Sequence, residues 1–265
     1  IYREIDNRLG EANALKSLGD AARMQSRYED AIGLYEEALS INREIGRRLG
    51  EANALQSLGD AAEMQGRYED AIGLYEEALP IYREIGSRLG EANALQSLGD
   101  AARMQGHYED AIRLYDEALP IYREIGSRIG EANALKSLGD AAQIQGRYED
   151  AIGLYDEALP IYREIGDRLG EANALNSLGD AARMQCRYED AIGLYEEALP
   201  IYREIGNRLG EANALYGNGE SLAATGSASA TGLLEDAKRL YESLGHKEAA
   251  DAIHEAMEQQ KRLVP

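Results

Sequence analysis

A 40-residue repeat constrains this chain more than any other feature of its sequence. Residues 47–86 and 87–126 are identical at 35 of 40 positions, and residues 127–166 match residues 167–206 at 33 of 40. Five full copies run from Asn7 to Gly206, and a sixth begins at Asn207 and then degenerates. A short unit repeated this often cannot bury its apolar face without its neighbours. The period therefore predicts a solenoid in place of the one or two globular domains usual at 265 residues.

Each repeat contains two segments with the periodicity of a helix. In the third copy the first segment spans about residues 88–105, and its apolar residues are three or four positions apart: Leu89, Ala92, Leu95, Leu98 and Ala102. The second segment spans about residues 108–125 and begins with two acids, which suit the positive end of a helix. We expect Ser87 to cap the first helix, and Gly106 and Gly126 to end the two helices. The pattern predicts an all-α chain of repeated helical hairpins.

A proline recurs inside the second helix of four copies, at Pro80, Pro120, Pro160 and Pro200. Proline removes one backbone hydrogen bond and crowds the preceding turn, at a cost of ~3 kcal/mol in an isolated helix. One interpretation is a tolerated kink, and the other is a helix that ends at the proline. We favour the kink, because Ile121 and Tyr122 continue the apolar stripe beyond Pro120.

The composition excludes several classes of function. The chain has 28 Lys and Arg against 48 Asp and Glu, a net charge of −20, which disfavours phosphate backbones and anionic membranes as partners. One Cys excludes an intrachain disulfide framework, and so few Cys and His argue against a structural zinc site. We recognise no catalytic Ser/His/Asp or Cys/His set, so we expect no enzyme activity, no metal and no cofactor. No stretch approaches the roughly 20 apolar residues that span a bilayer.

The repeat resembles the signature of the tetratricopeptide repeat (TPR) family. The resemblance rests on residues of the third copy: Leu95, Leu98, Gly99, Gly106, Tyr108, Ala111, Tyr115 and Ala118. The 40-residue form is similar to the repeats of the Pins/LGN adaptors and of NB-ARC-type signalling ATPases, and more loosely to kinesin light chains. The resemblance implies a right-handed superhelical solenoid whose first helices line a concave, peptide-binding groove. The usual aromatic residues of the first helix are replaced by Leu95 and Ala102, which predicts close helix packing.

Variation among the copies marks positions that packing does not dictate. Two columns of the first helix vary in chemistry among the repeats. In the third repeat they are represented by Gln96 and, seven residues later, by Arg103. Conserved Asn and Asp columns lie between them, so the four positions form one polar stripe. We assign this stripe to the groove, with these candidate binding residues: Asn53, Gln56, Asp60, Asn93, Gln96, Asp100, Arg103, Asn133, Lys136, Asp140, Asn173, Asn176, Asp180 and Arg183.

The stripe has a functional and a purely structural interpretation. An Asn ladder can donate to and accept from a peptide main chain, and the neighbouring charges would select side chains. Alternatively, the stripe is a solvated helix face in which Asp20 and Arg23 pair locally. An Asp column, where the carboxylate-clamp type of the family has Asn, would repel a C-terminal carboxylate, so we do not expect that ligand. We favour a scaffold that binds a peptide or helix of a protein partner. The alternatives are the sensor arm of a signalling ATPase and a self-assembling array.

The two ends of the chain differ from the repeats between them. Residues 1–6 match the end of a second helix and carry no visible signal peptide, so we expect a cytoplasmic fragment whose N-terminal edge can self-associate. Residues 207–245 form the degenerate sixth repeat, in which Asn218 replaces a core Leu and residues 227–232 are expected to form a loop. Residues 246–265 contain a last amphipathic helix, about Lys247 to Arg262, which we expect to cap the solenoid.

Overall fold

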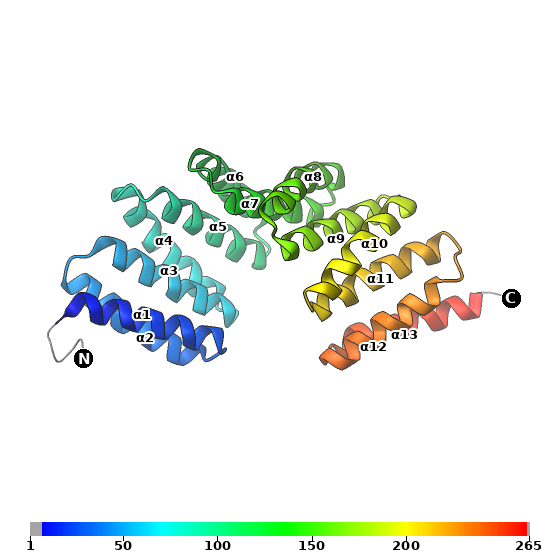
Figure 1. The fold of residues 1–265 in the computed structure, drawn as a ribbon, viewed down its shortest axis with the longest axis horizontal. Coiled ribbons are helices and arrows are strands. Elements are labelled where there is room, and N and C mark those ends of the chain that lie inside the picture. The colour runs from blue at the N-terminus through cyan, green and yellow to red at the C-terminus, as the bar shows by residue number, and fades with distance from the viewer. Residues whose placement is uncertain (1–6, 264–265) are drawn as a thin grey trace. The chain divides into compact units, whose positions relative to one another are not determined.

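The computed structural model describes residues 7–263, and the side chains of residues 7–257. These residues form thirteen α-helices and contain no strand (Figure 1). The first helices of the six repeats are α1 (Arg8–Met24), α3 (Arg48–Met64), α5 (Arg88–Met104), α7 (Arg128–Ile144), α9 (Arg168–Met184) and α11 (Arg208–Ala224). The second helices are α2 (Tyr28–Glu44), α4 (Tyr68–Glu84), α6 (Tyr108–Glu124), α8 (Tyr148–Ile165), α10 (Tyr188–Glu204) and α12 (Ala230–Leu244), and α13 (Lys247–Leu263) follows them. The predicted all-α hairpin repeat is confirmed.

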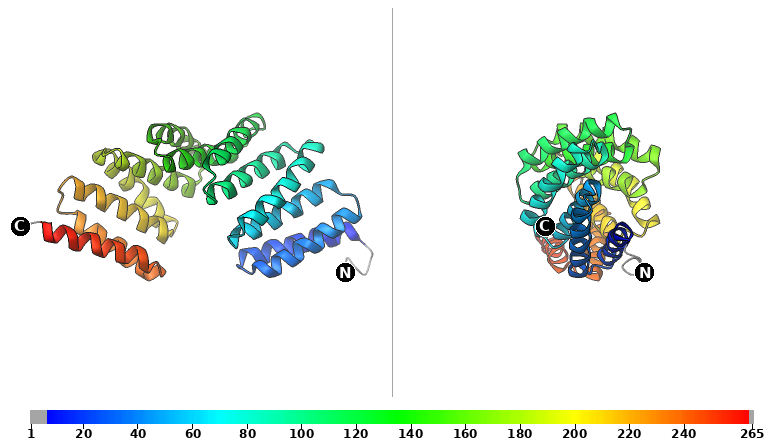
Figure 2. Two further views of the ribbon diagram at one scale, coloured as in Figure 1. Left: turned by 180° about the vertical axis from the view of Figure 1, so that it is seen from behind. Right: turned by 90° about the vertical axis from the view of Figure 1, so that its left-hand side faces the viewer.

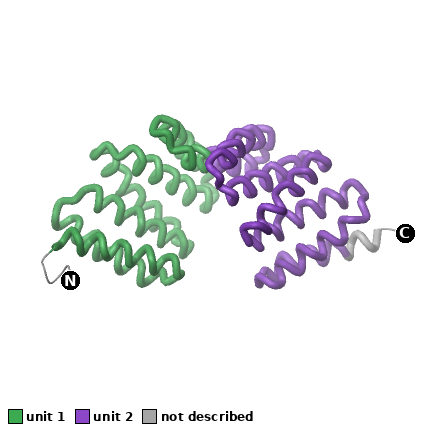
Figure 3. Tube along the Cα trace, in the orientation of Figure 1, with its two compact units in different colours: residues 1–134 green, residues 135–265 purple. Residues whose placement is uncertain are grey.

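The chain divides into two compact units, residues 1–134 and 135–265, with the boundary inside α7 (Figure 3). Within each unit a first helix packs against the second helix of its own repeat, as in α3 with α4 and α9 with α10. It also packs against the second helix of the preceding repeat, as in α3 with α2 and α9 with α8 (Figure 2). In the second unit α13 packs on α12. None of the helices described has the length and apolarity needed to cross a membrane.

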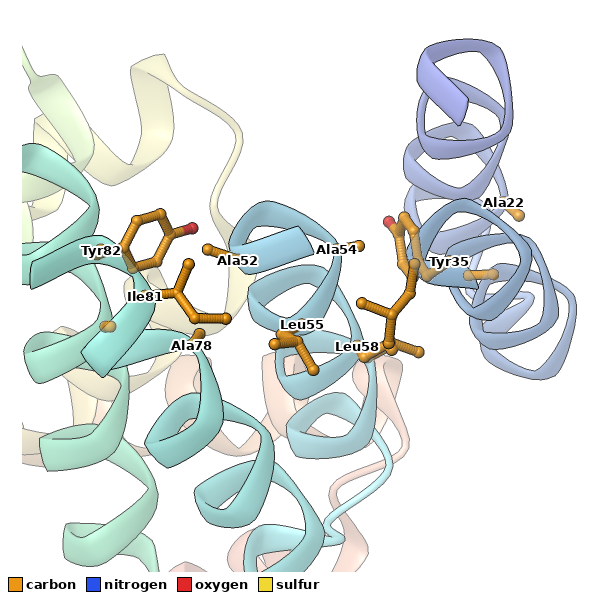
Figure 4. Close-up of a cluster of buried hydrophobic side chains, with 13 residues drawn as sticks. Ala22, Tyr35, Ala52, Ala54, Leu55, Leu58, Ala78, Ile81 and Tyr82 are labelled. Atoms are coloured by element: carbon orange, nitrogen blue, oxygen red, sulfur yellow. The ribbon is translucent and has the colours of Figure 1, made fainter. Parts of the chain in front are cut away.

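Leucine and tyrosine side chains fill the layers between the helices. Figure 4 shows Leu55 and Leu58 of α3 between Ile81 of α4 and Tyr35 of α2. Each of these four side chains is buried. A first helix therefore joins its own repeat to the preceding one, and no hairpin in the cluster buries its apolar face alone.

In each of the first five repeats a glycine inside the first helix makes room for a tyrosine ring, and in the third to sixth repeats a second glycine does the same. A Cβ atom added to Gly59 would lie 2.7 Å from Cδ1 of the Tyr75 ring, and Gly99 stands in the same relation to Tyr115. The second glycine, at the start of the next first helix, faces the other buried tyrosine, as Gly90 does the ring of Tyr82. The helices approach so closely at both places that only glycine fits without displacing a ring.

A buried carboxylate also joins neighbouring repeats. Glu51 of α3 accepts hydrogen bonds from Arg43 of α2 at 3.0 Å and from Arg48 at 2.6 Å. Burial disfavours the charged form of Glu51, but the two arginines outweigh it and lower its pKa. Arg43 also pairs with Glu77 of α4. The mid-helix acids of the second helix therefore link repeats as well as adding charge.

Three local expectations are corrected by the structure. Ser87 occupies the N-cap position of α5 as expected, but its side chain makes no capping hydrogen bond, whereas the side chains of Asp167 and Asn207 accept from the amides of Gly170 and Gly210 at 2.9 Å. The backbone angles at Ser87 and Asp167 are nearly the same, so the longer Asp side chain explains the difference. The expected loop 227–232 is shorter, because α12 already begins at the buried Ala230.

The third correction concerns Leu89, which the spacing placed on one apolar face with Leu95 and Leu98: those two are buried, whereas Leu89 is 52% exposed. The glycine stops are confirmed, since Gly106 and Gly126 have φ values of +80° and +68°. The helices do not end at their prolines, because α4 continues through Pro80 to Glu84. Pro80 and Glu76 are both exposed, so the carbonyl that loses its partner lies on the solvent side of the helix. The predictions for residues 1–6 lie outside the described part of the chain.

Candidate functional site

A hollow of about 670 Å³ in the first unit runs across three successive first helices. Four of the predicted residues line it: Asn53, Gln56, Asp60 and Asn93. Lys16, Asp20 and Arg23 of α1, together with Leu49, Leu89 and Tyr82, complete much of the wall. The helical period that placed these columns on one face thus brings residues of three repeats to one depression.

A second hollow, of about 410 Å³, lies in the other unit. It is lined by three predicted residues, Asn176, Asp180 and Arg183, with apolar and aromatic side chains of α7, α9, α11 and α12 around them. The remaining predicted residues belong to the same columns but are not among those that line these two hollows: Gln96, Asp100, Arg103, Asn133, Lys136, Asp140 and Asn173.

The Asp column binds the helix hairpins together. Asp60 accepts a hydrogen bond from the Tyr75 hydroxyl at 3.1 Å, and Asp100 accepts one from Tyr115 at 2.7 Å. The same bond recurs in the first, fourth and fifth repeats, between Asp20 and Tyr35, Asp140 and Tyr155, and Asp180 and Tyr195. One carboxylate oxygen of each Asp is therefore engaged within its own repeat, a role that sequence reasoning did not assign.

The Asn column accepts a similar hydrogen bond from the other buried tyrosine of the repeat. The side-chain carbonyl of Asn53 accepts from the Tyr82 hydroxyl at 2.8 Å, and that of Asn93 accepts from Tyr122 at 2.9 Å. Asn173 does so with Tyr202, and Asn213 with Tyr241. The bond orients the Asn amide, so its NH₂ group becomes the part of the ladder best placed to donate to a ligand.

Some charges of the stripe pair locally, as the structural interpretation expects. Lys16 and Lys136 pair with the Asp four residues later at 2.9 and 2.8 Å. Arg103 and Arg183 lie 4.0 and 3.8 Å from the Asp three residues before them. These contacts are partly exposed and contribute only tenths of a kcal/mol each.

Other polar atoms of the hollows are buried without a partner among the described residues. Oε1 of Gln56 and Nε of Arg23 are such atoms on the wall of the first hollow. The second hollow has an equivalent pair, Oδ1 of Asn176 and Nε of Arg183. The wall of each hollow therefore contains one buried acceptor and one buried donor without a partner among the described residues, and leaving such groups unpaired costs about 1–3 kcal/mol apiece.

Exposed apolar side chains flank the polar stripe. Leu49 and Leu89 lie four residues before Asn53 and Asn93 and line the first hollow. Ile144 and Met184 line the second hollow and are also exposed. The spacing of four residues places Leu89 on the face of Asn93, and that signal was present in the sequence. The hollows are thus lined by both polar and exposed apolar side chains.

The carboxyl groups of Asp60 and Asp180 ionise less readily than an ordinary Asp. Burial raises the pKa of both, while the tyrosine hydroxyl and a nearby Arg favour the charged form and offset part of that rise. Burial, with the charge of Asp60, also raises the pKa of Tyr82 to about 12. The tyrosines of the site are therefore neutral donors at neutral pH.

We expect Asp60→Asn to raise the free energy of unfolding at pH 7. A folded-state pKa above the unfolded value stabilises the fold fully below the unfolded pKa, and this stability is lost as pH rises through the folded pKa. The advantage of the variant should therefore disappear below a pH of about 4. Urea denaturation across this pH range measures it, with the exposed Asp116→Asn as the control for net charge. A gain in the free energy of unfolding that does not depend on pH would contradict the raised pKa of Asp60.

Comparisons with known proteins agree with this architecture. The sequence profile described as Tetratricopeptide repeat matches residues 10–84, 50–124 and 130–204. No curated protein sequence matches the chain. The solved structures that resemble it include a signal transduction ATPase with numerous domains (STAND) with a tetratricopeptide repeat sensor from Pyrococcus horikoshii. The two are 21% identical, with a TM-score of 0.74, and the match covers 89% of this chain and 35% of that one.

Two further structures have the same fold at low identity. A Rap protein in complex with competence and sporulation factor is 17% identical, with a TM-score of 0.69 over 95% of this chain and 75% of that chain. The nearly identical repeats of a putative kinesin light chain from Podosopora anserina are 15% identical, with a TM-score of 0.62 over 74% of this chain and 96% of that chain. Identities this low show the fold alone.

Proposed function

Because the chain belongs to the tetratricopeptide repeat family, we propose that it is a non-catalytic interaction scaffold that binds a peptide segment of a protein partner along its first helices. The ligand would lie in the hollows of the two units, against the stripe of Asn, Asp and variable residues. The all-α repeat fold is observed, and the binding of a peptide along it is what we propose.

The observation that supports this function most is the pair of buried, unsatisfied polar atoms in each hollow. The acceptor is on Gln56 and the donor on Arg23 in the first unit, and on Asn176 and Arg183 in the second, and a ligand reaches these buried atoms when the side chains change rotamer. A peptide main chain presents an N–H and a C=O group at nearly every residue, so it can satisfy both kinds of atom at once. The Asn NH₂ groups add donors in the same stripe.

The charges of the first hollow favour recognition of the main chain over recognition of net charge. Lys16 and Arg23 balance Asp20 and Asp60 on its wall. A ligand therefore gains no large Coulomb attraction there, and the exposed Leu49 and Leu89 offer contacts to apolar side chains instead. The residues that differ between repeats would then set which side chains are accepted.

The likeness to the Pyrococcus horikoshii ATPase favours a second candidate. That protein is described as having a tetratricopeptide repeat sensor, and this chain spans about a third of its length. A sensor arm would use the same hollows to bind its signal, so the two candidates differ in what adjoins the array. A self-assembling array is the third candidate, and it predicts no dependence on the hollows.

We expect groove variants to weaken peptide binding about tenfold or more. Peptides would be selected from a random display library with the full chain, and their affinities measured by calorimetry. The double variant Gln56→Ala/Leu89→Ser removes one polar and one apolar contact, worth about 1 kcal/mol each. The matched control is Glu76→Gln on the exposed face of α4, with circular dichroism to confirm helicity.

Unchanged affinity of every selected peptide for the groove variant would overturn the proposal. An equal loss with Glu76→Gln, which lies outside the hollows, would point to a non-specific effect and count against the groove. Concentration-dependent assembly without any peptide selection would favour the self-assembling array.

A further inference from the structure

Two rows of side chains cross the first hollow with the period of the repeat. Leu49 of α3 and Leu89 of α5 form one row, and both are exposed, at 42% and 52%. Asn53 and Asn93, one helical turn further along the same two helices, form the other row. The first row offers apolar contacts and the second offers hydrogen bonds, and the step of both rows is the distance between neighbouring first helices.

This step corresponds to about three residues of an extended peptide. Residues of α3 come within 8 Å of residues of α5, Cα to Cα, so the two helices are direct neighbours. Packed helices lie ~8–10 Å apart from axis to axis. A ligand that crosses them therefore meets a new Leu and a new Asn about every 9 Å.

Among the regular conformations of a peptide, polyproline II matches both rows. It has three residues per turn and rises about 3.1 Å per residue, so equivalent groups recur every ~9 Å on the same side. A β-strand turns every third side chain to the opposite face, and its same-face side chains recur after only ~6.7 Å. An α-helix presents residues seven apart at a step of ~10.5 Å, but it bonds its own carbonyl groups, so the Asn row would be left without acceptors.

The Asn row needs a ligand whose carbonyl groups are free. The side-chain oxygen of Asn53 accepts from the Tyr82 hydroxyl, and that of Asn93 accepts from the Tyr122 hydroxyl. The NH₂ groups are therefore the parts of both side chains that can serve a ligand, and they are donors. Polyproline II has no internal hydrogen bonds, so its carbonyl groups are free at every turn, and a proline in it has no N–H group that needs an acceptor.

The charges of the first hollow favour an uncharged segment. On its wall Lys16 and Arg23 balance Asp20 and Asp60. A charged ligand side chain would lose hydration there without a net Coulomb gain, whereas aliphatic and proline side chains carry no such cost.

We propose that the first hollow binds an uncharged segment of a partner protein in the polyproline II conformation, with a large aliphatic residue at every third position. The aliphatic side chains would pack on Leu49 and Leu89, and carbonyl groups one turn apart would accept from the NH₂ groups of Asn53 and Asn93. This inference rests on the proposed peptide-binding function and adds the conformation and the period of the ligand.

Two fluorescent peptides of one composition test the period. The first consists of four Leu-Pro-Pro units and a final Leu, and its prolines also hold the residues before them in an extended conformation. The second has the same leucines two and four positions apart, as two Leu-Pro-Leu-Pro-Pro-Pro units and a final Leu. Anisotropy titration with the full chain should show saturable binding of the first peptide and at least tenfold weaker binding of the second.

Variants of the protein test the two rows separately. Leu89→Ser removes one apolar contact, and Asn93→Asp removes one NH₂ donor but keeps the oxygen that accepts from Tyr122. Each should weaken binding of the first peptide at least fivefold. The controls are Leu244→Ser, at another exposed Leu, and Gln145→Glu, which adds the same charge at an exposed position of the other unit. Both should leave the affinity unchanged, and circular dichroism confirms the helicity of all four variants.

Equal affinity of the two peptides would overturn this inference, as would binding that neither Leu89→Ser nor Asn93→Asp weakens. Peptides selected from the random library separate its failure from that of the proposed function. Selected peptides that need Gln56 and Leu89 but lack a three-residue period would refute the inference and leave the function standing. A seven-residue period would assign the hollow to an α-helix instead. A library from which no peptide binds would refute both.

Discussion

Gly59→Ala is expected to lower the free energy of unfolding by about 3 kcal/mol, although alanine forms helices better than glycine. The added Cβ would lie 2.7 Å from Cδ1 of Tyr75, inside normal contact distance. Tyr75 is fully buried and its hydroxyl is held by Asp60 and Glu63, so the ring cannot move aside cheaply. The helices must separate or the tyrosine must leave its rotamer. Urea denaturation followed by circular dichroism measures the loss.

The same repeat provides a matched control in Gly73. Nothing lies within 4 Å of a Cβ atom at this exposed position of α4, and the third repeat already has Arg113 there. Gly73→Ala should therefore stabilise the chain by about 0.5–1 kcal/mol. In a Tyr75→Leu background the cost of Gly59→Ala should fall, because the clashing ring is gone. If both glycine variants shift stability in the same direction, close packing is not what requires Gly59.

This contrast shows which features of the fold the sequence could predict. The 40-residue period and the spacing of apolar residues predicted the hairpins and their ends, because both depend on local geometry. Neither could show that Gly59 contacts a ring while Gly73 faces solvent, since both are helix-interior glycines in the same repeat. That difference depends on which helix lies opposite, and it became visible only in three dimensions.

The sequence likewise predicted the position of candidate site residues on their helices but not their contacts. Variation among repeats and the 3.6-residue period predicted a polar stripe, and seven of its fourteen predicted residues line the two hollows. The hydrogen bonds that hold Asp60 to Tyr75 and Asn53 to Tyr82 were not predictable, because they join residues 15 and 29 positions apart on two helices. Leu89 was misplaced for a related reason: an apolar residue on a helix can line a core or a groove, and spacing alone does not distinguish them.

The second large effect on the free energy of unfolding is expected in the degenerate sixth repeat. Asn218 occupies the position of Leu178 and is 2% exposed, yet its Oδ1 atom has no hydrogen-bond partner in the part of the chain described. Asn and Leu have the same number of side-chain heavy atoms and the same branching, so Leu fits with little strain. We expect Asn218→Leu to raise the free energy of unfolding by about 2 kcal/mol, from relief of the buried amide and added apolar burial.

The reverse change in a regular repeat tests the same reasoning. Leu178→Asn should destabilise the chain by about 3 kcal/mol, because Leu178 is 4% exposed and an Asn there would be buried as Asn218 is. Since an array of repeats unfolds in parts, hydrogen exchange should show Asn218→Leu acting mainly on α11 and α12 and Leu178→Asn acting mainly on α9. Global denaturation midpoints and exchange protection together measure both effects. Equal stability of Asn218→Leu and the parent chain would mean that the Asn218 amide is satisfied in solution, and the sixth repeat would then owe its weakness to another residue.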